Sequence, residues 1–156
     1  MVKGIFDDPD FQLWVILMQA SDVFAKARAK EVNRYGITFR QSGVLFHLAA
    51  SNGESTIKDL SRWLMREPHS ILVIVNRMEK DGLITKERGK DGKGRTKIVI
   101  TEKGRQAYEK CLKWDSIKET LSVLSAAEKD QLFRSMKKIR GQAFGIINEP
   151  EKFSYP

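Results

Sequence analysis

Cysteine and histidine are scarce in this chain, whose 156 residues include one cysteine and two histidines. The single cysteine, Cys111, excludes an intramolecular disulfide and any zinc site built from several cysteines. The two histidines, His47 and His69, have no acidic cluster beside them, so we expect neither to bind a metal. The composition therefore predicts no metal and no cofactor. Cys111 is expected to be a small buried residue in a reducing compartment.

Enzyme motifs and long apolar runs are also absent from the sequence. There is no nucleophile elbow, no phosphate-binding loop and no pair of carboxylates at catalytic spacing. No stretch reaches the roughly 18 uncharged apolar residues that span a bilayer. Asp7, Asp8 and Asp10 precede the first apolar run, which is the wrong flank for a secretory signal. These absences predict a cytoplasmic protein that is neither an enzyme nor a membrane protein.

Positive charge is abundant, with a net charge of +8 and an isoelectric point near 9.6. Such a protein favours an anionic partner, nucleic acid ahead of a membrane surface, although a basic protein can also be merely soluble. Residues 84–105 hold eight lysines and arginines against three acidic residues, so +5 of the total +8 lies in one short segment. Concentrated charge indicates a binding surface more strongly than diffuse charge does.

Helical periodicity and turn residues predict six helices and a β-hairpin in one domain over residues 1–156. The helices are expected at about 10–35, 38–52, 56–65, 68–81, 101–114 and 125–147, and the strands at 83–88 and 96–101. Pro68 can lie only in the first turn of its helix. Capping residues mark other helix starts, namely Asp8, Thr38 with Gln41, Ser55 or Thr56, Thr101, and Ser125 with Glu128.

Both ends of the chain hold more apolar residues than one small core needs. A two-fold dimer built from the terminal helices would bury them, and the alternative is that they only cover the three-helix core. The residues concerned are Val2, Ile5, Phe6, Trp14, Leu121, Leu124, Leu132, Phe133, Met136, Ile139, Phe144, Ile146, Ile147 and Phe153.

The helix predicted at 68–81 has one apolar side and one polar side. At about 100° per residue, Ile71, Ile74, Val75 and Met78 cluster towards the core. The opposite side carries Arg66, His69, Ser70, Val73, Asn76, Arg77 and Lys80. Short polar side chains around one methyl-bearing residue are typical of a helix that contacts base edges in a DNA major groove.

Two residues of that polar side have alternative explanations. Val73 suits a thymine methyl group, but it would also be explained by packing on a neighbouring loop. Arg77 lies nearer the end of the helix, where it would bond a phosphate or pair with Glu79 or Asp81.

The predicted hairpin is basic at its tip. Glycine lets a tip settle into a narrow groove, and cations there supply affinity that falls with salt; the alternative is a solvated hairpin with no partner. The cations are Lys90, Lys93, Arg95 and Lys97, around Gly89, Gly92 and Gly94.

Four segments resemble the MarR family of winged helix-turn-helix transcription regulators. They are ITFRQSGVLFHL, IKDLSRWL, NRMEKDGLITKE and VITEKGRQAY, within residues 37–110. The resemblance implies a winged helix DNA-binding lobe at about 37–101, flanked by dimerisation helices at about 1–35 and 102–156. It also implies an obligate homodimer on a pseudo-palindromic operator, with the fourth helix in the major groove and the wing in the minor groove.

The resemblance carries the DNA-contacting roles onto His69, Ser70, Val73 and Arg77 in the helix and Arg95 in the wing. The predicted DNA-binding set also includes Arg40, Thr56 and Arg66. One departure concerns the wing, because Asp91 and Arg95 are four residues apart here (DGKGR), whereas the family commonly has Asp-x-Arg. A second concerns redox sensing, since peroxide-sensing members carry their cysteine in the first helix and Cys111 falls in the fifth.

Many members of the family lose DNA affinity when a small aromatic or anionic molecule binds between the dimer and DNA-binding lobes. The aromatic candidates for such a pocket are Trp14, Phe39, Phe46 and Trp114. The sequence therefore predicts a sequence-specific double-stranded DNA-binding regulator, a homodimeric repressor released by a small ligand. The alternative is a winged helix that docks an acidic protein partner through its basic hairpin.

Overall fold

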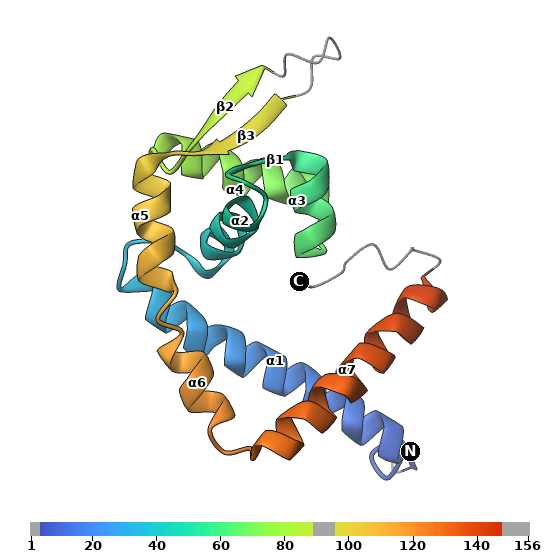
Figure 1. Ribbon diagram of the computed structural model, residues 1–156. Coiled ribbons are helices and arrows are strands. Elements are labelled where there is room, and N and C mark those ends of the chain that lie inside the picture. The colour runs from blue at the N-terminus through green and yellow to red at the C-terminus, as the bar shows by residue number, and fades with distance from the viewer. Residues whose placement is uncertain (1–3, 89–95, 148–156) are drawn as a thin grey trace.

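The computed structural model describes residues 4–88 and 96–147. It is mainly helical, with a small antiparallel sheet of order β1-β3-β2 (Figure 1). In chain order the elements are α1 (Pro9–Asn33), α2 (Phe39–Ala50), β1 (Glu54–Thr56), α3 (Ile57–Leu64), α4 (Pro68–Lys80), β2 (Ile84–Arg88), β3 (Thr96–Ile100), α5 (Glu102–Cys111), α6 (Asp115–Leu121) and α7 (Ala126–Ile146).

The predicted capping residues begin the helices where the sequence places them. Thr38 accepts from the backbone N–H of Gln41, whose side chain accepts from the Thr38 N–H in return. Ser125 and Glu128 form the same reciprocal box at the start of α7. Each cap satisfies N–H groups that have no partner inside the helix, which explains why the sequence alone locates these starts.

Two elements differ from the sequence prediction. Strand β1 is not predicted from the sequence. It pairs antiparallel with β3, and Ser55 lies opposite Ile98. Helix α6 separates α5 from α7, so three helices follow the hairpin rather than two. The predicted 101–114 helix ends early, at Cys111, and Trp114 begins α6 as its N-cap residue. Trp114 is left-handed there (φ 53°), which is uncommon for a bulky residue and has no sequence marker.

The core lies between the sheet and helices α2, α3 and α4. Fully buried side chains come from all of these elements, namely Val44, Leu45, Leu48, Leu60, Ile71, Val75, Met78, Ile84 and Ile98. Each such side chain contributes about 1.5–3 kcal/mol relative to exposure. This packing holds α4 with its polar side outward, as the helical wheel predicts.

Gly104 sets how closely α5 approaches the sheet. A Cβ at this position would lie 2.1 Å from the backbone oxygen of Leu83 and 2.8 Å from the Ile100 side chain. Only glycine fits such a contact, so α5 leaves the sheet at a fixed place and leads the chain towards α6.

Helices α1, α6 and α7 lie on the side of the molecule opposite the sheet (Figure 1). Along α7 only Phe144 is buried, and Trp14 and Phe133 are more than half exposed. The terminal apolar residues therefore do not simply cover the three-helix core. Val2 and Phe153 lie outside the described residues. None of the described helices is both long and apolar enough to cross a membrane.

Candidate nucleic-acid interface and adjoining cavity

Helix α4 presents the residues that the wheel assigns to its outer side. Ile71, Val75 and Met78 are fully buried, whereas His69, Ser70, Val73 and Arg77 are exposed. Val73 is 58% exposed, so the alternative that it packs on a neighbouring loop is wrong. Leu72, which the wheel did not single out, is also exposed at 41%.

Arg77 is not paired with the two acids that the sequence offers it. Glu79 instead pairs with Lys86, and Asp81 accepts a hydrogen bond from Gln41. Within residues 4–88 and 96–147, Arg77 forms no ion pair, so its guanidinium is available to an external anion.

The N-terminus of α4 is open to solvent. Pro68 occupies the first turn, and Glu67 at the capping position makes no side-chain hydrogen bond. Exposed backbone N–H groups and the positive end of the helix dipole favour an anion there, and Arg66 lies exposed beside them. The start of this helix therefore has the electrostatic character that a phosphate group needs.

The turn between α3 and α4 is held by short contacts. Met65 takes a left-handed conformation (φ 50°), and the Ser61 hydroxyl donates to the Arg66 backbone oxygen at 2.5 Å. These contacts set the angle between the two helices of the helix-turn-helix.

Two other residues of the predicted DNA-binding set have different surroundings. The Thr56 hydroxyl caps α3, accepting from the Asp59 N–H at 3.1 Å and donating to the Asp59 carboxylate at 2.7 Å. Arg40 is exposed at the start of α2, where it lines a cavity together with Arg66. Thr56 therefore has a local structural task, and Arg40 belongs to the cavity wall as well as to the exposed surface.

Of the predicted wing cations, Lys90, Lys93 and Arg95 lie outside the described residues, as do Gly89, Gly92 and Gly94. Lys97 is described: its Nζ lies 2.6 Å from the Glu54 carboxylate on β1. Lys86 and Lys103 of the same basic segment also bond within the protein, Lys103 to the Asp81 backbone oxygen at 2.7 Å. Part of the local positive charge therefore serves the fold.

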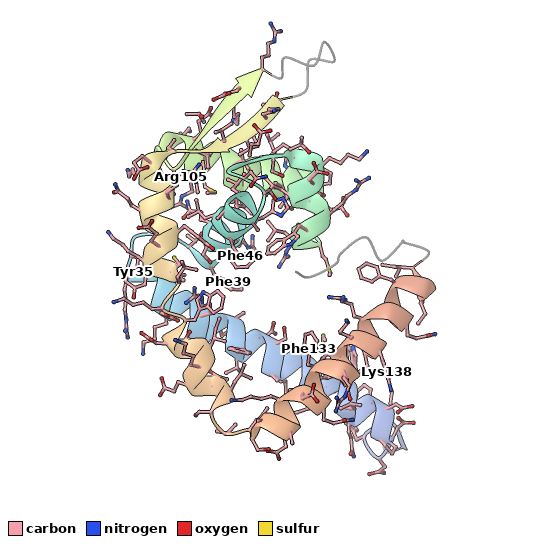
Figure 2. All side chains as sticks on the ribbon, viewed as in Figure 1. Tyr35, Phe39, Phe46, Arg105, Phe133 and Lys138 are labelled. Carbon is pink, nitrogen blue, oxygen red and sulfur yellow. The ribbon has the colours of Figure 1, made fainter. Side chains whose placement is uncertain are left out.

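A cavity of about 670 Å³ separates the winged helix lobe from α1, α5 and α6. Phe39, Phe46 and Trp114 line it, as the sequence predicts; Phe39 and Phe46 lie on the side of α2 that faces α1 (Figure 2). Trp14 does not line it, and this part of the prediction is wrong. The cavity takes its α1 residue, Arg28, from the other end of the helix, about 21 Å along the axis from Trp14 at 1.5 Å per residue.

The described cavity wall combines aromatic rings with arginines and has no carboxylate. Phe46 stacks on Trp63, with ring centroids 5.5 Å apart, and touches Tyr108 and Trp114. The arginines are Arg28, Arg40, Arg66 and Arg140. Sequence reasoning missed Trp63, Tyr108 and all four arginines as cavity residues, because their convergence from five helices leaves no local pattern.

One wall of the cavity is α4 itself. Ser70 and Ile74 line it, and Ser70 belongs to the outer side of the same helix. A molecule in the cavity would therefore contact the helix that carries the candidate DNA-binding residues.

A buried charge network adjoins the cavity through Arg28, which lines it. Arg28 is 7% exposed; its Nη2 donates to the Cys111 backbone oxygen at 2.6 Å, and its Nη1 lies 2.7 Å from the Glu31 carboxylate. Burial alone would raise the pKa of Glu31, but hydrogen bonds from Ser116 and Arg28 outweigh it and lower that pKa to about 2. Glu31 is therefore ionised at neutral pH.

Cys111 on α5 and His47 on α2 both make contacts that suit a structural role. Cys111 is 4% exposed, and burial raises the pKa of its thiol, which disfavours the reactive thiolate. His47 packs on the Trp63 ring, and its Nε2 lies 2.9 Å from the Ser55 hydroxyl. No group of three histidine, cysteine or acidic side chains among the described residues is arranged to hold a metal.

A sequence model of the MarR family matches residues 35–94, which run from the start of α2 through α4 and β2. The organohalide-sensing transcriptional regulator RdhR-CbdbA1625, solved in a 2,4-dichlorophenol-bound form, shares 28% identity over 96% of this chain and 92% of its own, with a TM-score of 0.84. The chain is thus similar to the MarR family in sequence over residues 35–94 and to MarR-family regulators in fold. Sco5413, a MarR family transcriptional regulator from Streptomyces coelicolor, shares 25% identity over 86% of this chain and 95% of its own, with a TM-score of 0.77.

A third MarR-like structure is that of MepR from S. aureus in complex with DNA. It shares 20% identity over 87% of this chain and 99% of its own, with a TM-score of 0.75, and at this identity the likeness shows the fold alone. A search of curated proteins gives no match. RdhR-CbdbA1625 and Sco5413 are both transcriptional regulators.

Proposed function

We propose that this protein is a MarR-family homodimeric repressor whose DNA binding is released by a small aromatic or anionic molecule. The observation that carries the proposal is the position of α4 between two surfaces. Its outer side is polar, exposed and open at the N-terminus, and its flank, through Ser70 and Ile74, lines the cavity. One helix would thus contact both proposed ligands.

In this proposal α4 reads the major groove and the wing supplies affinity. His69 and Ser70 contact base edges or phosphate near the helix start, and Val73 contacts a thymine methyl group. Arg66 and Arg77 bind phosphates, while Lys97 and the tip residues Lys90, Lys93 and Arg95 bind DNA along the minor groove. Arg40 and Thr56 lie at the edge of this surface and contact only the sugar-phosphate backbone of the DNA.

The second copy would cover the apolar residues of the terminal helices. Large apolar side chains are exposed along α1 and α7, among them Trp14, Val23, Phe133 and Ile146. An exposed apolar surface of this kind marks an association site. A two-fold dimer would place two copies of α4 on the half-sites of a pseudo-palindromic operator.

The effector would bind in the cavity beside α4. Aromatic walls with arginines and no described carboxylate suit an acidic aromatic molecule, which gains ring stacking and charge pairing together. The RdhR-CbdbA1625 structure with 2,4-dichlorophenol supplies a probe of this chemistry. Pressure of the ligand on Ser70 and Ile74 would tilt α4 away from its DNA-bound position.

The test begins with selection of bound duplexes from a random pool, followed by titration of the selected duplex and a scrambled one. We expect nanomolar binding of the selected duplex, weakening steeply with salt, and reversal by 2,4-dichlorophenol. Val73→Ala should change the selected sequence, whereas Arg77→Ala should weaken all duplexes alike. Equal binding of selected and scrambled duplexes, with retention of an acidic peptide, would favour a protein-docking module instead.

A further inference from the structure

Lys86 of the basic β2 strand is directed towards α4 and not outward. Its Nζ donates to the Asn76 side-chain oxygen at 2.5 Å and to the Glu79 carboxylate at 2.7 Å. It lies opposite Ile98 on β3, so it shares the face of the hairpin that packs on the core. Its side chain is 24% exposed, compared with 42% for Glu79.

The contact fixes how the Asn76 amide is oriented. A lysine ammonium has three donors and no acceptor, so the atom facing it must be the amide oxygen and not the nitrogen. The NH₂ group of Asn76 is then turned away from Lys86. Asn76 is exposed on α4, three residues after Val73 and seven after His69, which places it on the same outer side of the helix.

We propose that Lys86 is a specificity-determining positioning residue, which makes Asn76 a hydrogen-bond donor to base edges. The inference rests on the proposed function, in which α4 reads the major groove. With its oxygen held, Asn76 selects a base that offers acceptors there, either guanine through N7 and O6 or thymine through O4.

Adenine is disfavoured at the same position. Asparagine recognises adenine by accepting from N6 and donating to N7 at the same time. Here the oxygen already accepts from a charged donor, and the adenine amino group would approach beside that positive charge. Removal of the ammonium frees the oxygen and permits the adenine contact.

Glu79 provides the matched control for this arrangement. It holds the ammonium from the other side, is partly exposed, and contacts no DNA in the proposal. Glu79→Gln keeps a hydrogen-bond acceptor for Lys86 and leaves the Lys86–Asn76 contact in place. Lys86→Arg also keeps a donor opposite the Asn76 oxygen, whereas Lys86→Met removes it with a side chain of similar length.

The experiment selects duplexes from a random pool with the wild-type chain, K86M, K86R, E79Q and N76A. We expect the wild type, K86R and E79Q to select guanine or thymine at one base pair of each half-site. K86M should lose that preference by roughly tenfold and gain adenine, and N76A should accept any base there. The N76A/K86M double variant should select as N76A does, because Lys86 acts through Asn76.

Base preference at other positions separates a specificity role from a structural one. If K86M weakens binding of all duplexes equally, or selects the wild-type sequence, the inference is overturned. If the selected sequence changes with V73A but not with N76A or K86M, the inference fails and the proposed function stands. A wild-type chain that selects no sequence overturns both.

Discussion

Arg28 donates a hydrogen bond to the backbone oxygen of Cys111, 83 residues further along the chain, and so ties the end of α1 to the end of α5. Its neighbour Glu31 holds the start of α6, accepting from the N–H groups of Asp115 and Ser116 at 3.0 and 3.1 Å and from the Ser116 hydroxyl. One buried ion pair on α1 therefore joins the end of α5 and the start of α6 to α1.

The first prediction concerns the loss of that ion pair. Glu31→Gln leaves the Arg28 guanidinium buried without its charge partner, and breaking one side of a buried pair costs about 3–5 kcal/mol. The free energy of unfolding in urea, at one protein concentration, measures the effect. Ser116→Ala is the control, since it removes one hydroxyl donor and should cost only about 1 kcal/mol. Equal losses in the two variants would contradict the importance of the charge.

The pKa of the same group predicts how stability depends on pH. The pKa of Glu31 is lowered from 4.5 to about 2 by folding. Because the folded pKa is the lower one, the carboxylate stabilises the protein above pH 4.5, and this contribution is lost as pH falls towards 2. The loss is on the order of 3 kcal/mol. The free energy of unfolding should be measured at several values between roughly pH 6 and pH 2, the range set by the two pKa values. It should depend less on pH for Glu31→Gln than for the wild type.

The caps and the α4 face could be predicted from the sequence because they depend on neighbours. Thr38 and Gln41 are three residues apart, and the buried and exposed sides of α4 follow from the helical repeat. The physical cause lies within one or two helical turns in each case, so a local pattern is enough.

The contacts of the Arg28–Glu31 pair and the cavity could not be predicted because their residues meet only in the folded chain. Arg28 and Glu31 form an ordinary i, i+3 pair in the sequence, and nothing there indicates Cys111 or Ser116 as partners. Strand β1 is likewise stabilised by pairing with β3, some forty residues away. Trp14 is a false prediction of the cavity wall and not a missed residue. It lies on α1, which does contribute to the wall, but at the wrong end of that helix.

The third prediction concerns the contact between α5 and the sheet. Gly104→Ala places a Cβ 2.1 Å from the Leu83 backbone oxygen, and neither backbone can move without loss of the Leu83–Thr101 hydrogen bond. We expect a loss of about 3 kcal/mol, measured by urea unfolding, which is the upper end of the usual cost at overpacked sites that force backbone shifts. Gly145→Ala on α7, where a Cβ meets nothing within 4 Å of this chain, should leave stability unchanged or slightly higher.

The last prediction concerns the turn of the helix-turn-helix. Met65 adopts a left-handed conformation and is 57% exposed, so it bears the backbone strain while burying little surface. Met65→Gly should therefore raise the free energy of unfolding by about 0.5–1 kcal/mol. Trp114 has almost the same φ, but its ring packs near Phe46 in the cavity wall. Trp114→Gly should thus lower stability, because the apolar surface it loses, about 1.5–3 kcal/mol, outweighs the relief of strain. A stabilising Trp114→Gly, or a destabilising Met65→Gly, would show that backbone strain does not decide the outcome at these two turns.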